Sequence, residues 1–324
     1  MARAIGRRGG GQLMRITIIG AGVSGLVAGR RLVDAGATVI IVDKGRSVGG
    51  RLATRRIGGA TFDHGAQFFT VRTPAFQAQV DDWVERGLVE VWTHGFAGDD
   101  GHPRYAAPGG MNSLAKDLAT GLDVRCPVMA FAVRPSEGGC DVVLDDATVI
   151  AGDAVVVTTP LPQAFSLMAD APIEIDRDVF HADYDRTIAL LAVLDRPADL
   201  GSVGARQAPS DDVAFVADNQ RKGVSEVPAL TLHAAPEWSL AHWDDDIEAL
   251  AIGLEALAAP FVGEAEIVER QVKKWRFATP QRVWPEPCWT TLDGRIVLAG
   301  DAFAGPKVEG AHNSGLAAAH ALLG

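Results

Sequence analysis

Three glycines at positions 20, 22 and 25 have the spacing of a loop that binds the diphosphate of a dinucleotide. In such a loop the first glycine allows a tight turn and the second lets the backbone approach the phosphates. The third lets the following helix pack closely against the preceding strand. Asp43 comes 18 residues after Gly25, where its carboxylate can accept hydrogen bonds from a ribose. This pattern predicts a dinucleotide-binding site.

The sequence on both sides of the glycines predicts the strands and the helix that must position these residues. Residues 16–19 form an apolar, β-branched run that predicts a buried strand. A helical pattern of apolar residues follows and ends at Gly36, a residue typical of a helix C-terminus. Residues 39–42 predict a second buried strand that ends on Asp43. The glycine loop therefore has the strand–helix–strand context that a dinucleotide site requires.

Two further features indicate that the dinucleotide is FAD. Gly49, Gly50 and Arg51 follow Asp43 closely and can bring backbone and a cation onto the same diphosphate. Near the other end of the chain, a predicted strand at 296–299 leads into Gly300 and Asp301, which suit the ribityl chain of a flavin. A helix of small residues comes next, and its N-terminus would face the flavin pyrimidine ring, where negative charge collects on reduction.

The charge distribution also suits a diphosphate ligand. The net charge is −11 over 324 residues, yet residues 1–60 carry 11 basic and 2 acidic side chains. The remaining 19 basic and 39 acidic residues argue against nucleic acid as a partner. Residues 1–13 are basic and glycine-rich, and we expect them to be disordered rather than an export signal. No segment is long and apolar enough to predict a membrane span.

The three cysteines predict neither a metal site nor covalent attachment of the flavin. Cys126, Cys140 and Cys288 lack metal-ligand spacing and cannot all pair, which favours a reducing, cytoplasmic compartment.

The order of predicted elements indicates an α/β protein with two discontinuous domains. We expect a Rossmann-like FAD-binding domain over 14–74, 105–170 and 285–324. An α+β substrate domain is expected over 75–104 and 171–284, because strands dominate from about 171 to 279 with one long helix near 247–257. A helix at 74–84 with Phe76, Val80, Trp83 and Val84 on one face, and a single strand over 124–133, are also predicted.

Several stretches together resemble the renalase family, within the wider amine-oxidase-like FAD superfamily. They are IIGAGVSGLVAGRRL, GGRLATRR, FDHGAQFFT, RYAAPGGMNSLAKDLA, LHAAPEWS, WRFATP and AGDAFAGPKVEGAHNSGLAAA, and they span nearly the whole chain from Met14 onward. The resemblance implies noncovalently bound FAD. It also implies oxidation of the 2- and 6-dihydro isomers of NAD(P)H to NAD(P)+, with molecular oxygen as acceptor and hydrogen peroxide as product.

Hydride transfer from a dihydropyridine needs positioning groups rather than an acid, base or nucleophile. His233 is the predicted catalytic residue, since it lies in a family motif and could hydrogen-bond the carboxamide of the substrate; the alternative is a structural histidine. His64 is expected to pack a loop. Arg55 and Arg56 could meet a phosphate or be solvated, and Trp275 could line the pocket or lie in the core.

The predicted cofactor-binding residues are Gly20, Gly22, Val23, Ser24, Gly25, Asp43, Lys44, Gly50, Arg51, Gln67, Val128, Thr159, Gly300, Asp301, Val308, Glu309 and Ala311. Two other functions stay open. An amine or amino-acid oxidase would need an aromatic cage, for which the chain offers few tyrosines, although Trp284 or Trp289 could substitute. A flavin-binding protein without turnover is the third possibility.

Overall fold

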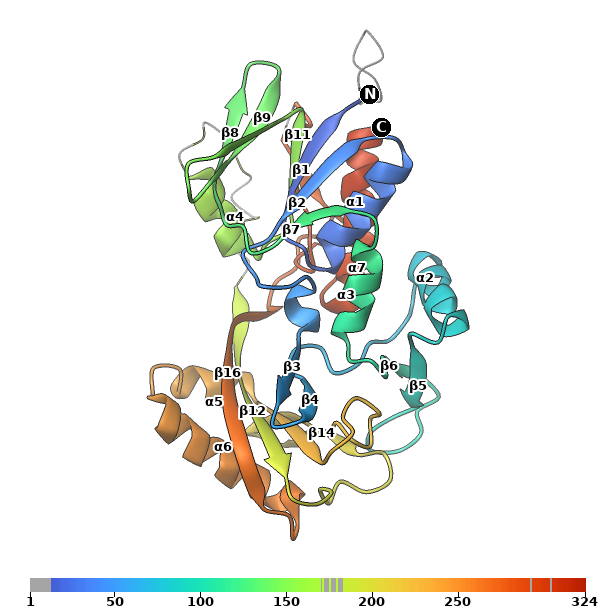
Figure 1. Ribbon diagram of the computed structural model, residues 1–324, viewed down its shortest axis with the longest axis vertical. Coiled ribbons are helices and arrows are strands. Elements are labelled where there is room, and N and C mark those ends of the chain that lie inside the picture. Colours follow the sequence, from blue (N-terminus) through green and yellow to red (C-terminus); the bar gives the residue numbers. More distant parts are fainter. Residues whose placement is uncertain are drawn as a thin grey trace. The chain divides into compact units, whose positions relative to one another are not determined.

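The structure is a computed structural model that describes residues 13–169, 171, 175, 179, 183–291, 293–303 and 305–324. The chain forms two compact units (Figure 1). Unit 1 comprises residues 1–50, 115–183 and 280–324, and unit 2 comprises 51–114 and 184–279. The segments 51–74 and 105–114, expected in the FAD domain, belong to unit 2, and 171–183 and 280–284 belong to unit 1. The expected disorder of residues 1–13 falls, except for Leu13, outside the described residues.

Unit 1 is built on a six-stranded sheet in the order β17-β18-β11-β1-β2-β7. The central strand β1 (Arg15–Ile19) runs parallel to β2 (Thr38–Val42) and to β11 (Ala154–Val157). The strands β7 (Asp123–Arg125) and β18 (Ile296–Leu298) extend the parallel sheet, and β17 (Trp289–Thr290) adds an antiparallel edge. This is the Rossmann-like arrangement predicted from the sequence, which is therefore confirmed.

Small residues let the helices of unit 1 pack closely against each other. Helix α1 (Val23–Asp34) lies beside the C-terminal helix α7 (Lys307–Leu323), as Figure 1 shows. A Cβ atom at Gly315 of α7 would collide with the backbone carbonyl of Ser24, so glycine is what permits this close approach. Helix α4 (Leu161–Met168) follows β11, and the Arg30 guanidinium of α1 donates to carbonyls at the end of α3 (Asn112–Ala119).

A three-stranded antiparallel sheet is inserted after β7. It consists of β8 (Ala130–Ser136), β9 (Gly139–Leu144) and β10 (Val149–Gly152). The single strand expected over 124–133 is wrong, because β7 ends at Arg125 and β8 begins only at Ala130. Pro127 lies in the gap, and a proline has no amide hydrogen with which to continue a strand ladder.

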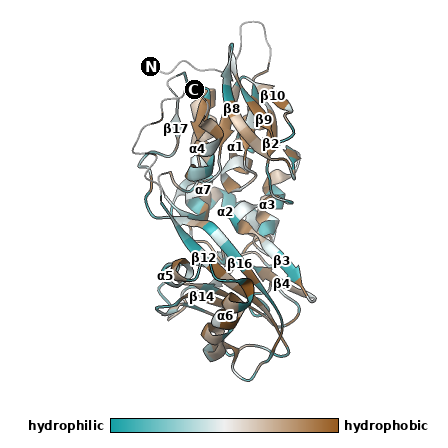
Figure 2. Cartoon of the chain, turned by 90° about the vertical axis from the view of Figure 1, so that its left-hand side faces the viewer, coloured by the Kyte–Doolittle hydropathy of each residue, from teal (hydrophilic) through white to brown (hydrophobic). Residues whose placement is uncertain are grey.

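Unit 2 has a five-stranded sheet in the order β13-β14-β15-β12-β16. These strands are β12 (Tyr184–Leu194), β13 (Ala205–Ser210), β14 (Val213–Asp218), β15 (Ala229–Ala234) and β16 (Ile267–Pro280). Helix α6 (Ile247–Val262) covers one face and buries Leu250 and Leu254 against alternate residues of β12 and β15. Asp246 caps this helix by accepting from two backbone amides, and α5 (Pro236–Ala241) precedes it. Figure 2 shows α6 mainly in hydrophobic colours.

The other face of this sheet is covered by a hairpin that explains the domain boundary. Strands β3 (Thr54–Ile57) and β4 (Ala60–Asp63) follow the short helix η1 (Gly50–Leu52). Phe62 and Ala60 pack against Leu191, Val193 and Ala229 of the sheet. Because this apolar contact buries the hairpin in unit 2, the chain leaves unit 1 at Gly50 rather than at residue 74.

The rest of unit 2 is a helix and a small hairpin. Helix α2 (Pro74–Glu85) buries Phe76, Val80 and Trp83, as expected, whereas Val84 is 46% exposed and lies off that face. Strands β5 (Glu90–Thr93) and β6 (Arg104–Ala106) pair antiparallel.

No helix among the described residues is long and apolar enough to cross a membrane. The three cysteines are free thiols, and burial raises the pKa of Cys140 to about 12.

Candidate functional site

The glycine loop after β1 leaves a side-chain-free cradle in unit 1. Gly20 has a φ of +111°, and a Cβ there would lie 2.5 Å from Thr158 Oγ1. A Cβ at Gly25 would collide with the carbonyl of Gly20, so this residue must be glycine for the helix to pack. Gly22 differs from both, because a Cβ there would meet no atom within 4 Å. Its φ of −78° also suits any residue, so nothing in the described protein requires glycine at position 22. The open space beside Gly22 fits a bound diphosphate.

Asp43 and Gly50 complete the walls of this cradle. Asp43 Oδ2 accepts from the Ala21 amide at 2.7 Å, and Oδ1 accepts from the Gly45 amide at 2.6 Å. A Cβ at Gly50 would lie 3.6 Å from the Cα of Gly22, so the two glycines are neighbours. The Val128 amide donates to the Asp43 carbonyl, which places Val128 beside the expected ribose site. Asp43 thus also supports the glycine loop, a role that the spacing alone did not indicate.

Two buried hydroxyls in this region lack a hydrogen-bond partner among the described residues. They are Ser24 Oγ, on the first turn of α1, and Thr159 Oγ1, just past β11. Both follow the carboxyl ends of parallel strands, where open α/β sheets bind their ligands. An unpaired buried hydroxyl is costly and fits a polar ligand that supplies the missing partner. The residues present therefore fit a dinucleotide such as FAD.

A second group of predicted cofactor residues of unit 1 lies between positions 300 and 311. Val308, Glu309 and Ala311 are on the first turns of α7, whose N-cap residue, Pro306, makes no side-chain capping hydrogen bond. Asp301 is 6% exposed, and the Gly300 amide before it donates to Ser314 Oγ at 2.8 Å. Unit 1 holds the predicted residues Gly20, Gly22, Val23, Ser24, Gly25, Asp43, Lys44, Gly50, Val128, Thr159, Gly300, Asp301, Val308, Glu309 and Ala311.

The structure places Arg51, Gln67 and His233 in unit 2. The Arg51 guanidinium donates to the carbonyl of Ala278 at 3.2 Å and lies 6.0 Å from the Tyr184 ring centre. Gln67 is 5% exposed, and its Nε2 donates to the carbonyl of Asp63 at 2.6 Å. Both side chains therefore organise unit 2, and their predicted contacts with FAD stay predictions.

His233 belongs to a compact group that we name the His64 cluster, consisting of His64, His233 and Trp275. The carbonyl oxygen of His64 lies 3.2 Å from His233 Nε2 and accepts a hydrogen bond from Trp275 Nε1 at 2.7 Å. The rings of His64 and Trp275 stack with centroids 5.2 Å apart. Trp275 is half-buried, so it is a wall of this cluster rather than a core residue.

The carbonyl of His64 fixes the tautomer of His233. A carbonyl only accepts, so Nε2 must carry the proton of this hydrogen bond. Burial lowers the pKa of His233 to about 4, although the hydrogen bond with the His64 backbone raises it in part; the charges of His64 and Lys222 lower it slightly further. The ring is therefore neutral near pH 7, and Nδ1 is left as a hydrogen-bond acceptor. Burial, together with Lys273 and Arg55, likewise lowers the pKa of His64 to about 4.

A buried ion pair holds the loop that carries His64, and the sequence prediction missed it. Lys222 Nζ donates to Asp63 Oδ2 at 2.8 Å, and both side chains are 0% exposed. Asp63 Oδ1 accepts from Thr54 Oγ1 and from the Met111 amide. The sequence shows an acidic residue next to a histidine in FDHG. The lysine that pairs with this acid lies 159 residues further along the chain and is not part of any recognisable motif.

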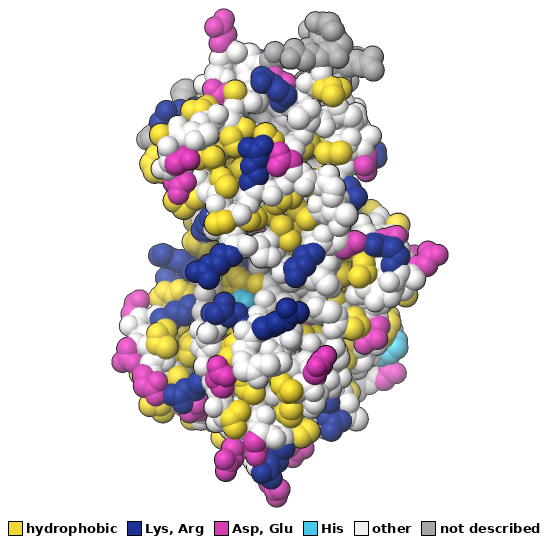
Figure 3. Space-filling view, in the orientation of Figure 1, with side chains coloured by type: hydrophobic (Ala, Val, Ile, Leu, Met, Phe, Trp, Pro, Cys, Tyr) yellow, Lys and Arg dark blue, Asp and Glu magenta, His cyan; other side chains and the backbone are white. Residues whose placement is uncertain are grey.

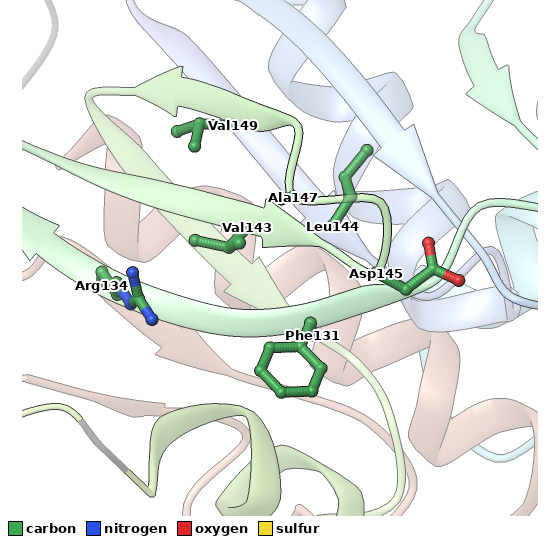
Figure 4. A pocket seen from close by; sticks show the side chains of 7 residues that line it. All are labelled: Phe131, Arg134, Val143, Leu144, Asp145, Ala147 and Val149. Carbon is green, nitrogen blue, oxygen red and sulfur yellow. The ribbon is translucent and has the colours of Figure 1, made fainter.

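A surface depression lies elsewhere, on the three-stranded sheet of unit 1 (Figure 4). None of the predicted site residues lines it. Its lining residues are Phe131, Arg134, Val143, Leu144, Asp145, Ala147 and Val149. Within the described part of the chain, no group of three or more His, Cys, Asp or Glu side chains could hold a metal ion.

Comparison with known proteins places the chain in a family. Residues 79–323 match the model of flavin containing amine oxidoreductases, and residues 18–83 match an NAD(P)-binding Rossmann-like domain. A putrescine oxidase structure has a TM-score of 0.72 at 18% identity, covering 95% of this chain and 98% of that one. A putative protoporphyrinogen oxidase from Exiguobacterium sp. 255-15 has a TM-score of 0.69 at 14% identity, covering 95% and 98%.

A curated relative is similar to this chain over a short segment. The 4,4'-diapophytoene desaturase of Staphylococcus aureus strain Newman is 46% identical over 52 residues, which is 16% of this chain and 10% of the desaturase. The chain thus matches only a tenth of that relative's length, over a short segment. With a family model covering most of its residues and a glycine cradle that fits FAD, the chain belongs to the flavin containing amine oxidoreductases.

Proposed function

We propose that this flavin oxidoreductase oxidises the 2- and 6-dihydro isomers of NAD(P)H to NAD(P)+. The substrate gives up a hydride and becomes NAD(P)+. Molecular oxygen takes the electron pair and proton of that hydride together with one further proton from solvent, and becomes hydrogen peroxide. The bound flavin supplies the two-electron acceptor between the two half-reactions. The resemblance of GGRLATRR and FDHGAQFFT to the renalase family supports this substrate class.

The observation that carries the proposal is the neutral, oriented imidazole of His233. Its Nδ1 can accept a hydrogen bond from the amide N–H of a nicotinamide carboxamide, because Nε2 is engaged by the His64 carbonyl. The stacked rings of His64 and Trp275 offer a flat aromatic surface beside it. A dihydropyridine carboxamide is a flat, neutral ring with one amide, and these groups match it in shape and polarity.

The role of these residues is to position rather than to exchange protons. A hydride donor must be held at near-attack distance and correct angle, and a loss of orientation costs rate even when binding persists. His233 would fix the ring through its carboxamide, and the Asp63–Lys222 pair would hold the loop that orients His233. Molecular oxygen needs none of these contacts, so the cluster should matter for reduction and not for reoxidation.

An amine oxidase is the second candidate, because putrescine is bound in one of the structurally similar proteins. The electrostatics around the His64 cluster oppose it. Lys273 and Arg55 are near enough to His64 to lower its pKa, so both add positive potential at the His64 ring. A positive potential repels an ammonium or diammonium substrate and attracts an anionic dinucleotide. The two tyrosines also form no cage, because Tyr105 stacks on Phe69 and Tyr184 packs against Phe277.

Anaerobic mixing of the flavin-loaded protein with single substrates tests the proposal. We expect rapid bleaching of the flavin by 6-dihydroNAD and none by ordinary NADH or putrescine. Bleaching by putrescine alone would establish the amine oxidase instead. If no compound bleaches the flavin although dithionite does, the protein binds flavin without turning over either class of substrate.

A further inference from the structure

The hairpin β3–β4 runs along one face of the edge strand β16, and three contacts define how the two segments align. Arg51 reaches the carbonyl of Ala278, and Trp275 reaches the carbonyl of His64. At the far end of the hairpin, a Cβ on Gly58 would collide with the carboxylate of Glu269. Arg55 lies between Arg51 and Gly58 in β3, so this alignment places it along the middle of β16.

The side chain opposite Arg55 is Lys273. Residues of a strand alternate between its faces, so Lys273 shares a face with Glu269 and Trp275, both of which meet the hairpin. The next residue, Lys274, faces away and donates to the carbonyl of Trp243 at 2.5 Å. Arg55 is directly opposite Phe62 in the hairpin, on the side that packs on the sheet, whereas Arg56 is opposite Thr61 on the other side.

Arg55 and Lys273 therefore face each other, and no carboxylate neutralises them. Among the described residues neither is within ion-pair distance of an acidic group; Glu269 shares the face but lies at the Gly58 end. Lys273 is half-buried and Arg55 exposed. Burial and the nearby Arg55 both lower the pKa of Lys273, with no opposing contribution from an acid. Figure 3 shows basic side chains close to a histidine on the face it draws, and Figure 2 shows the hydrophilic character of β16.

Two unpaired cations beside an aromatic cluster are unfavourable unless an anion joins them. A phosphate accepts hydrogen bonds from a guanidinium and an ammonium at the same time, and such contacts are among the strongest in proteins. We propose that Arg55 and Lys273 form an anion subsite that binds a phosphate group of the substrate beside the His64 cluster. This proposal rests on the dinucleotide oxidase function and specifies how that substrate is recognised.

The first test compares Arg55→Gln and Lys273→Gln with the matched control Arg56→Gln in FAD-loaded protein. Anaerobic stopped-flow absorbance gives both the limiting rate of flavin reduction and the apparent Kd for 6-dihydroNAD. We expect each subsite variant to raise the apparent Kd about tenfold. The limiting rate and FAD content should stay at parent values, and Arg56→Gln should match the parent throughout. Parent-like affinity in both subsite variants, or loss of FAD from them, would overturn the proposal.

Shortened and extended substrates identify the phosphate. The 6-dihydro forms of nicotinamide riboside, NMN, NAD and NADP carry no phosphate, one phosphate, a diphosphate, and a diphosphate with a 2′-phosphate. A Kd effect that begins with NMN assigns the phosphate next to the nicotinamide ribose, one that begins with NAD assigns the adenosine side, and one confined to NADP assigns the 2′-phosphate. An equal effect on the riboside would overturn the subsite, because that compound has no phosphate to lose.

Calorimetric titration with inorganic pyrophosphate separates this proposal from the oxidase function. If the parent fails to oxidise 6-dihydroNAD, the proposed function has failed. Binding of pyrophosphate by the parent and by Arg56→Gln, weakened about tenfold in the two subsite variants, would still establish the anion subsite. Absence of pyrophosphate binding to the parent would then overturn the subsite as well.

Discussion

Lys222 Nζ lies 2.8 Å from Asp63 Oδ2, with both side chains 0% exposed. Burial lowers the pKa of Lys222, and the Asp63 carboxylate opposes this by stabilising the charged ammonium. Asp63 also accepts from the Met111 amide and from Thr54, so its charge is paired and hydrogen-bonded. Since His64 is the next residue, this ion pair fixes the backbone carbonyl on which His233 and Trp275 depend.

Removal of one partner of this pair should strongly destabilise unit 2. Lys222→Met leaves the Asp63 carboxylate buried without its counter-charge, and we expect a loss of about 3–5 kcal/mol in the free energy of unfolding. The double variant Asp63→Asn with Lys222→Met removes both charges and should recover much of that loss. Urea denaturation of the FAD-loaded proteins measures both, and equal stability of the single and double variants would contradict the pairing.

Gly22→Val should abolish FAD binding while the protein still folds. A Cβ atom at position 22 has no described protein atom within 4 Å and needs no unusual φ, so a side chain there extends into the space assigned to the diphosphate. The flavin-to-protein absorbance ratio reports occupancy, and far-UV circular dichroism reports the fold. Gly36→Val is not a suitable control because of its φ of +90°, whereas Gly98→Val meets no neighbour and has no positive φ. Full flavin content in Gly22→Val would show that the diphosphate lies elsewhere.

Asp43→Ala should weaken FAD binding by about 1–3 kcal/mol, as expected for loss of a charge-assisted hydrogen bond. The structure adds a second cause, because the Ala21 and Gly45 amides lose their acceptor. Asp43→Asn keeps one acceptor oxygen and should lie between the parent and Asp43→Ala. Equilibrium titration of the apoprotein with FAD gives the affinities. An unchanged Kd in Asp43→Ala would show that Asp43 makes no contact with the ribose of FAD.

His233→Ala should slow flavin reduction by 6-dihydroNAD about ten- to a hundred-fold, the effect of one positioning hydrogen bond worth about 1–3 kcal/mol. FAD content and the rate of reoxidation by oxygen should be unchanged. His233→Gln retains an amide donor for the His64 carbonyl and should be slowed less. Stopped-flow absorbance of the two half-reactions separates the effects, and a parent rate of reduction in His233→Ala would make this histidine structural.

The two histidines of the cluster should make the protein less stable as the pH falls from 6.5 to about 4. Each has a pKa lowered from 6.5 to about 4 in the folded state, so between these values the unfolded chain binds more protons. Stability therefore rises with pH across this range and is fully present above it. Urea midpoints measured at several pH values test this. The double variant His64→Gln with His233→Gln should show a shallower slope than the parent, and an equal slope would refute the assignment.

The nucleotide-binding unit was predictable from the sequence because its signals are local. A buried strand, the turn at Gly20 and the helix after Gly25 occupy one continuous stretch, and each imposes its own geometry. The chain's departure from unit 1 at Gly50 was not predictable in this way. It depends on Phe62 packing against Leu191 and Val193, which are more than a hundred residues away.

The candidate site of unit 2 could be predicted only in part, because it too depends on contacts between distant segments of the chain. His233 stood out by its motif, yet what fixes its tautomer is a backbone carbonyl, a group that every residue possesses. The pairing of Asp63 with Lys222 likewise requires the fold to bring together two distant segments. The placement of Arg55 opposite Lys273 follows from the alignment of a hairpin with an edge strand, which no periodicity in the sequence encodes.

The interleaved segments of the two units have a consequence for the order of events during synthesis. Unit 2 is complete once Thr279 has been made, whereas unit 1 still lacks β18 and its last helix, α7, which packs on α1. We therefore expect a nascent chain to acquire a protease-resistant unit 2 first and to remain unable to retain FAD until α7 leaves the ribosome. Proteolysis of stalled chains ending after Thr279 would show this, and flavin retention by such chains would contradict it.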